Sequence, residues 1–237
     1  NGLDYEVSNP ATDPRSAAHY TVETLDQKYA NKQELRQRFW LRDVFKPIVC
    51  FVGRLDHQKG VPLITHAIGY CLQHGCQFVL LGTSPDSRIA QHFSGLKHFY
   101  NDNPDCHLEL GFNEDLSHLI YAGSDMIIVP SLFEPCGLTQ MIGLRYGTVP
   151  IVRATGGLLD TVFDANHANK PYGERNGYVF NDFNTAGIES ALERAIGMWN
   201  NFPQHFRELM ANGMRTDYSW NHPGQNYLNV YDYIREK

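Results

Sequence analysis

The sequence lacks an excess of positive charge, because its 26 acidic residues outnumber its 20 lysines and arginines and give a formal net charge of -6. Such a chain carries no electrostatic footprint for a phosphate backbone, so we expect no nucleic-acid partner. It also lacks any run of about 18 apolar residues and any charged segment followed by an apolar leader. We therefore expect a soluble chain with no signal peptide and no membrane partner.

Several common chemical motifs are missing as well. The five cysteines form no Cys-x-x-Cys pair, which favours reduced thiols in a reducing compartment; all except Cys136 are expected to be small buried hydrophobes. The 11 histidines show no metal-ligand spacing, so no metal site is expected. No Gly-x-Ser-x-Gly elbow, Walker A loop or Gly-x-Gly-x-x-Gly fingerprint occurs, which disfavours hydrolases, P-loop enzymes and dehydrogenases.

What the sequence does contain is a regular alternation of short apolar runs and longer amphipathic stretches. The runs predict strands at residues 48–52, 78–81, 107–110, 126–129, 149–152 and 177–180. Helices are expected at about 61–74, 87–100, 115–122, 137–146 and 185–200. Continuously apolar strands are typical of a sheet covered on both faces. The alternation therefore predicts an α/β fold with a doubly wound, Rossmann-like parallel sheet.

Both ends of the chain depart from this alternation. Residues 1–15 are rich in Asn, Asp and Pro and predict an extended loop, and residues 16–41 carry a helical pattern with a break at Asn31-Lys32. Near the other end, an aromatic stripe recurs at helical spacing: Trp220, Tyr227, Tyr231 and Tyr233. We expect this aromatic stripe to pack partly on a neighbour outside the chain.

A basic turn, Gly53-Arg54-Leu55-Asp56-His57-Gln58-Lys59-Gly60, follows the first predicted strand. Two cations and the start of the next helix can converge there on an anion such as a pyrophosphate. Residues of this kind also occur in ordinary βα turns with solvated charges, and the motif alone does not choose between the two.

An acidic segment, Phe133-Glu134-Pro135-Cys136-Gly137-Leu138-Thr139-Gln140, follows the strand predicted at 126–129. It places a carboxylate where a parallel strand hands over to a helix, which is where α/β sheets bind ligands. Small residues after Glu134 would let backbone amides approach a ligand closely, and Thr139 adds a hydroxyl. The alternative is a glutamate placed in a first helical turn by the helix dipole.

A later pair, Gly156-Gly157, allows either a close-approach loop or a simple tight turn, and the turn is slightly favoured.

Together with Leu116-Ser117-His118, Arg145-Tyr146-Gly147 and Thr155-Gly156-Gly157-Leu158, these segments make the chain resemble the C-terminal half of bacterial glycogen synthases and soluble plant starch synthases, with most similarity to starch synthase classes III and IV. The resemblance implies one half of a two-domain GT-B-type glycosyltransferase. Residues 1–15 would be the interdomain linker, 16–218 the nucleotide-sugar-binding Rossmann-like domain, and 219–237 a C-terminal helix packing towards an N-terminal domain.

The resemblance also implies roles for individual residues. Arg54 and Lys59 would bind the diphosphate of ADP-glucose, and Glu134 would lie beside the transferred glucose. Phe112 stands where the family usually has a tyrosine that stacks on adenine, so the stacking face is kept without the hydroxyl. The remaining donor-binding positions implied in this way are Gly53, Cys136, Gly137, Leu138 and Thr139.

Two departures limit what the resemblance implies. Retaining relatives outside this family carry a second glutamate eight positions after the first, where this sequence has Ile142, as is usual within the family. The family's Lys-x-Gly-Gly-Leu motif is absent, so the acceptor domain is expected to lie outside this chain, and the isolated chain is expected to be inactive.

The expected function is therefore donor binding in a retaining ADP-glucose:α-1,4-glucan glucosyltransferase, with ADP-glucose and an α-1,4-glucan as substrates, an N-terminal acceptor domain as partner, and no cofactor. The parent protein is expected in the plastid stroma of a plant or alga, which is the preferred location, or in the cytoplasm of a bacterium. Two alternatives remain open: the donor domain of a GT-B enzyme with another nucleotide sugar, and a non-catalytic nucleotide- or glucan-binding module.

Overall fold

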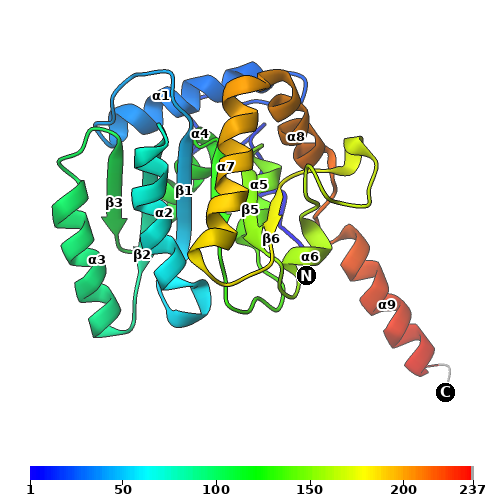
Figure 1. Cartoon of the computed structure of the whole chain (residues 1–237). Coiled ribbons are helices and arrows are strands. Elements are labelled where there is room, and N and C mark those ends of the chain that lie inside the picture. The colour runs from blue at the N-terminus through cyan, green and yellow to red at the C-terminus, as the bar shows by residue number, and fades with distance from the viewer. Residues whose placement is uncertain (236–237) are drawn as a thin grey trace.

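The computed structural model describes residues 1–235, the side chain of His222 excepted, and most of them surround one parallel sheet (Figure 1). The six strands are β1 (Ile48–Arg54), β2 (Gln77–Thr83), β3 (Cys106–Leu110), β4 (Met126–Val129), β5 (Val149–Arg153) and β6 (Tyr178–Phe180). Their order is β3-β2-β1-β4-β5-β6, and every neighbouring pair is parallel. The predicted doubly wound, Rossmann-like fold is confirmed.

Helices cover both faces of the sheet (Figure 1). The α-helices are α1 (Lys28–Arg38), α2 (Val61–Gln73), α3 (Ser87–Tyr100), α4 (Glu114–Gly123), α5 (Thr139–Arg145), α6 (Leu158–Thr161), α7 (Thr185–Asn201), α8 (Pro203–Arg215) and α9 (Asn221–Arg235). Short 3-10 turns occur at Leu25–Gln27, His57–Lys59 and Tyr172–Glu174. Each helix predicted between strands is present within about two residues of its expected bounds.

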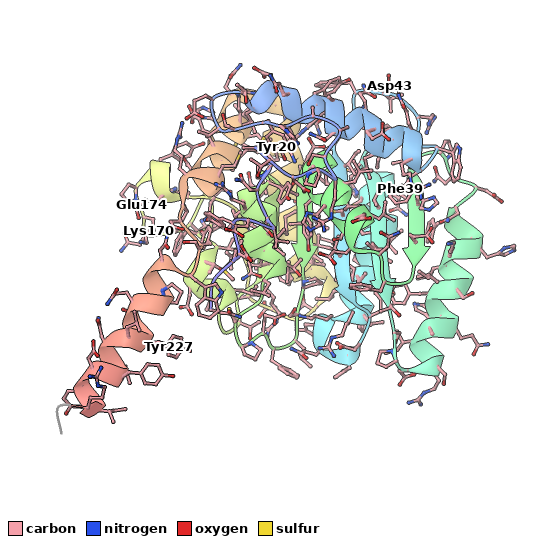
Figure 2. The ribbon with its side chains drawn as sticks, turned by 180° about the vertical axis from the view of Figure 1, so that it is seen from behind. Tyr20, Phe39, Asp43, Lys170, Glu174 and Tyr227 are labelled. Carbon is pink, nitrogen blue, oxygen red and sulfur yellow. The ribbon has the colours of Figure 1, made fainter. Side chains whose placement is uncertain are left out.

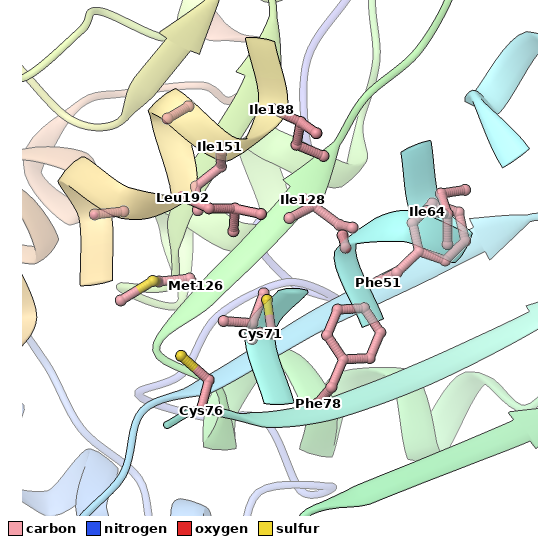
Figure 3. Packing of buried hydrophobic residues seen from close by; sticks show 14 of the residues in the cluster. Phe51, Ile64, Cys71, Cys76, Phe78, Met126, Ile128, Ile151, Ile188 and Leu192 are labelled. Carbon is pink, nitrogen blue, oxygen red and sulfur yellow. The ribbon is translucent and has the colours of Figure 1, made fainter. Parts of the chain in front are cut away.

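The core is divided by the sheet because successive strand residues point to opposite faces. In β1, Val49 and Phe51 join a cluster with α2, α3 and α7, whereas Ile48 and Cys50 join a cluster with α1 and α4. Figure 3 shows the first cluster, in which the aromatic and aliphatic side chains of the strands interlock with those of α2 and α7. All five cysteines are free, and all except Cys136 are buried, as the sequence predicted.

The N-terminal region differs from the prediction in where its helix lies. Residues 16–24 form no helix, and α1 runs without interruption through Asn31 and Lys32, so the predicted break is wrong. Asn31 is fully buried; its amide donates to the carbonyl of Ala18 at 2.8 Å and accepts from the Ala18 amide at 3.2 Å. Its polar side chain therefore anchors the preceding segment to the helix.

The C-terminal helix α9 projects away from the sheet and its covering helices (Figures 1 and 2). The predicted helix is confirmed over Asn221–Arg235, while residues 236 and 237 lie outside the described residues. Its apolar and aromatic side chains are exposed, including Tyr227, Leu228 and Tyr231. Just before α9, Ser219 pairs in parallel with Leu3, which places the two ends of the domain side by side. Within residues 1–235 no helix combines the length and apolarity needed to cross a membrane.

Candidate functional site at the switch point of the sheet

The strand order reverses direction between β1 and β4. From β1 the chain adds β2 and β3 on one side, and then β4, β5 and β6 on the other. The loops that leave the carboxyl ends of β1 and β4 therefore diverge from each other, and in doubly wound sheets the crevice formed there is the usual ligand site. The basic turn follows β1 and the acidic segment follows β4, so the topology brings the two predicted motifs together.

Lys59 and Glu134 are in direct contact across this point. The Nζ atom of Lys59 lies 2.5 Å from Oε2 of Glu134, and the hydroxyl of Ser131 donates to the same oxygen at 3.0 Å. Glu134 is 7% exposed, and its charge is balanced by the ammonium group. Lys59 is held in place because its backbone amide donates to Asp56, the N-cap of the 3-10 turn, at 3.0 Å.

Arg54 is placed differently from Lys59. It is the last residue of β1, its side chain is 61% exposed, and its guanidinium pairs with Asp56 at 3.4 Å. Its charge is therefore screened by water, and the side chain is free to turn towards an anion. The two predicted cations lie on the same turn, but only Lys59 forms part of the packed structure.

The two loops also touch through backbone atoms. Gly60 has a φ of 79°, and a Cβ added there would lie 2.2 Å from the carbonyl oxygen of Pro130. Only glycine allows this approach, which closes the β1 loop against the end of β4. The backbone carbonyl of Gln58 accepts from the Leu132 amide at 2.8 Å, so the loops are hydrogen-bonded as well.

The Gly156-Gly157 pair makes a close approach to the acidic segment, and the preference for a simple turn is corrected. A Cβ on Gly156, at a φ of 48°, would lie 2.0 Å from the carbonyl oxygen of Glu134, and one on Gly157 would lie 2.6 Å from Cα of Cys136. The Gly157 amide donates to that Glu134 carbonyl at 3.0 Å. The loop after β5 thus supports the backbone of the candidate carboxylate.

Phe112 lies at the other side of Arg54, on the loop after β3. The residue is 86% exposed and lines a cavity of about 220 Å³ together with Gly53, Arg54, Thr83 and Ser117. An exposed aromatic ring beside a guanidinium suits the base and the adjoining phosphate of a nucleotide. The structure thus joins Phe112 to Arg54 in one cavity, and Lys59 to Glu134 in one contact.

The other predicted donor-binding residues follow Glu134 in the chain. Gly137 has a φ of 78°, Cys136 is half-buried, and Leu138 is exposed at the start of α5. The side chain of Thr139 lies beside the buried phenol of Tyr121. Their role in binding stays a prediction.

Two residues shape the site in ways that sequence reasoning did not assign: Gln140 ends the acidic segment without a predicted role, and Arg153 lies outside the predicted motifs. Arg153, at the end of β5, donates from Nε to the Ser131 carbonyl at 2.7 Å and from Nη2 to the Leu132 carbonyl. Gln140 is fully buried and donates to the carbonyls of Cys136 at 3.1 Å and Gly137 at 2.8 Å. Both side chains are hydrogen-bonded to the backbone of a loop, a role that the sequence pattern of neither segment reveals.

Within the described part of the chain, no three His, Cys, Asp or Glu side chains are arranged to hold a metal ion.

This geometry agrees with comparison to known protein families. The family model described as Glycosyl transferases group 1 matches residues 32–209, which include every motif of the site. The chain belongs to the glycosyl transferases group 1 family. It is 66% identical over 236 residues to glycogen synthase 1 of Nitrosococcus oceani and 61% identical over 237 residues to glycogen synthase 2 of Methylococcus capsulatus.

Among solved structures, the catalytic domain of starch synthase IV from Arabidopsis thaliana, bound to ADP and acarbose, superimposes with a TM-score of 0.98 at 41% identity. The match covers 100% of this chain and 48% of that one. The chain likewise spans about half the length of the curated relatives, 48% of the first and 49% of the second. The resemblance to glycogen and starch synthases inferred from the motifs is confirmed.

Proposed function

We propose that this chain binds the ADP-glucose donor of a retaining α-1,4-glucosyltransferase that lengthens glycogen or starch. The contact between Lys59 and Glu134 at the switch point carries the proposal, because it sets a phosphate-binding cation beside a carboxylate suited to sugar hydroxyls. The neighbouring cavity with Phe112 and Arg54 supplies a place for the base. The ADP bound to the related starch synthase supports the choice of nucleotide.

In this proposal each residue acts through its position. Arg54 and Lys59 bind the diphosphate and stabilise the charge that grows on ADP as it leaves. Glu134 contacts the glucose, and Cys136, Gly137, Leu138 and Thr139 line the sugar and phosphate positions. Before the donor binds, Lys59 neutralises Glu134; the incoming phosphate then shares the same ammonium, so the pair positions the cation in advance.

The bond changes of the proposed reaction follow from retention. The bond between C1 of glucose and the diphosphate oxygen breaks, and the acceptor's hydroxyl attacks C1 on the face that ADP leaves. Its proton passes to the departing phosphate oxygen, so no separate base is required. The transition state resembles an ion pair, and the two cations stabilise its anionic half.

Glucosyl transfer needs more than this chain in the proposal. Residues 1–15 would link to an N-terminal acceptor domain, and the exposed aromatic face of α9 would pack towards it. The chain's higher identity to bacterial glycogen synthases than to the plant starch synthase favours glycogen as product and a bacterial cytoplasm as the location.

Isothermal calorimetry with ADP, UDP, GDP and NAD tests the donor assignment. We expect ADP to bind with a Kd on the order of tens to hundreds of micromolar, since the site is open and few contacts are buried. UDP and GDP should bind at least tenfold more weakly, and NAD should not bind. Equal affinity for ADP and UDP would contradict the assignment.

A further inference from the structure

Trp40 has a backbone conformation that normally belongs to glycine. Its φ is 52°, and within residues 1–235 it is the one non-glycine residue with a positive φ. It follows α1, where its amide donates to the Gln37 carbonyl at 3.3 Å and the Leu41 amide donates to the Arg36 carbonyl at 2.9 Å. This pair of bonds is the Schellman ending of a helix, whose left-handed position strongly favours glycine because a side chain there is strained.

The side chain of this residue does not pack in the core. Trp40 is 78% exposed, so burial of its indole does not compensate for the strain. It lines a cavity of about 280 Å³ with Arg38, His107, Glu109 and Phe112, and its ring centroid lies 6.3 Å from that of His107. An exposed tryptophan in a disfavoured conformation beside a cavity is a candidate for ligand binding.

The polar wall of this cavity is held in a fixed arrangement. The carboxylate of Glu109 contacts Nε2 of His107 at 3.1 Å and accepts from Nζ of Lys97 at 3.3 Å. Burial lowers the pKa of His107, which favours the neutral ring, although Glu109 partly opposes the shift. A neutral imidazole, a carboxylate and the guanidinium of Arg38 together offer donors and acceptors for adjacent hydroxyl groups.

We propose that Trp40 and this cavity form an accessory site for an α-1,4-glucan chain, an inference that rests on the proposed function. The indole face would stack on the apolar face of one glucose ring, while Arg38 and Glu109 bind its hydroxyls. A nucleotide fits less well, because Glu109 would repel its phosphates and Lys97 is already paired. Phe112 lines this cavity and the nucleotide cavity alike, so the two sites adjoin.

The accessory site would act by tethering. A glucan held at Trp40 keeps its other segments within a short distance of the switch-point site, which raises the local concentration of chain ends. The expected consequence is a preference for long acceptors over short ones, without any new contact to the reacting sugar.

Calorimetry with maltoheptaose tests the site on this chain and on three variants. Trp40→Ala and Trp40→Gly should each weaken binding at least tenfold. Phe99→Ala is the matched control, since Phe99 is an exposed aromatic residue on α3, beside the same edge strand, and does not line the cavity; it should bind maltoheptaose like the parent. Trp40→Gly should also raise the melting temperature by about 2–4 °C, because it relieves the strained conformation.

The stability measurement separates loss of binding from misfolding. A more stable Trp40→Gly chain that no longer binds maltoheptaose supports the accessory site. Three results would overturn the accessory site. One is a parent chain that does not bind maltoheptaose, and another is binding of maltoheptaose by both Trp40 variants as tight as that of the parent. The third is a nucleotide that displaces maltoheptaose from the parent and whose own binding is lost in the Trp40 variants. ADP titrations of the same samples distinguish the two proposals. If the parent binds ADP but not maltoheptaose, only the accessory site is contradicted. If the parent does not bind ADP, the donor assignment is contradicted.

Discussion

At the scale of single residues, the ion pair between Lys59 and Glu134 connects ligand binding with the stability of the fold. A carboxylate that is 7% exposed loses its balancing charge if the lysine is removed. Arg54, in contrast, has a largely exposed side chain whose only ion pair is with Asp56 on the same turn, among the described residues. Removing the positive charge should therefore affect fold stability at Lys59 but not at Arg54.

We expect Lys59→Ala and Arg54→Ala each to reduce ADP affinity by about 1.5–3 kcal/mol, the range for charge-assisted contacts. Only Lys59→Ala should also lower the free energy of unfolding, by roughly 2–4 kcal/mol, because it leaves a buried charge unpaired. Urea denaturation and calorimetry on the same preparations measure both. The double variant Lys59→Ala/Glu134→Gln should recover part of the lost stability; no recovery would show that Lys59 does not stabilise the fold through Glu134.

The acid limb of stability should depend on Asp164. Burial would raise the pKa of this carboxyl, but the Val179 and Asn166 amides and the Arg194 guanidinium outweigh burial and lower it. Because the native pKa lies below the unfolded one, the stabilisation is complete above about pH 4 and is lost as pH falls through the native pKa. Asp164→Asn should reduce stability at pH 7 and flatten its fall below pH 4, as followed by thermal melts. An unchanged acid limb would contradict this role.

Much of the site could be predicted from its residues, because charged and glycine-rich turns directly after apolar strands mark the ligand edge of a parallel sheet. The pairing of Lys59 with Glu134 could not, since the two residues are 75 positions apart and their contact depends on β1 and β4 being neighbours. Arg153 escaped notice for a similar reason. Its partners are backbone carbonyls of another loop, and these leave no trace in residue type.

At the scale of elements, short apolar runs located every strand, while the amphipathic pattern located the helices between them. The exception near the N-terminus has a physical cause. Asn31 and Lys32 look like a helix break, but tertiary partners use their polar groups: Lys32 pairs with Asp125 at 2.7 Å, and Asn31 bonds Ala18. Helix α8 was not predicted, because its Asn, Gly and Gln residues weaken the propensity that packing on α5 and α7 overrides.

The loop after β5 should be sensitive to the smallest possible side chain. Gly156→Ala adds a Cβ that would collide with the Glu134 carbonyl in a backbone conformation that alanine disfavours. We expect a loss of at least about 2 kcal/mol in stability and weaker ADP binding, since the acidic segment must shift. Gly95→Ala is the control, because no atom outside its own helix lies within 4 Å of its added Cβ; it should stabilise α3 slightly. Equal effects at both positions would refute the close approach.

At the scale of the whole molecule, the candidate site is open to solvent on the side that faces away from the sheet. The Lys59–Glu134 pair and the cavity at Phe112 lie along a single open edge of the sheet, and the chain spans about half the length of its curated relatives. We expect the chain alone to transfer no glucose, because orientation and charge stabilisation worth on the order of ten kcal/mol require groups outside it.

Incorporation of labelled glucose from ADP-glucose into glycogen measures this, with the full-length glycogen synthase 1 of Nitrosococcus oceani as the positive control. In a longer protein that carries this chain, Glu134→Gln should depress turnover far more than it weakens ADP binding, since the proposed function places the carboxylate against glucose and not against phosphate. A rate from the chain alone that equals the full-length rate would contradict a two-domain mechanism.

The parallel pairing of Leu3 with Ser219 has a consequence for how such a unit can be reused. A fold whose entry and exit lie side by side can be spliced into a host chain as a cassette, because the host has to open only a narrow gap to receive it. For the same reason the order of its segments can be permuted: in a chain shortened to remove α9, a short loop could join Ser219 to Leu3, and new ends could be cut at the exposed Gly173, where no neighbouring atom lies within 4 Å of an added Cβ.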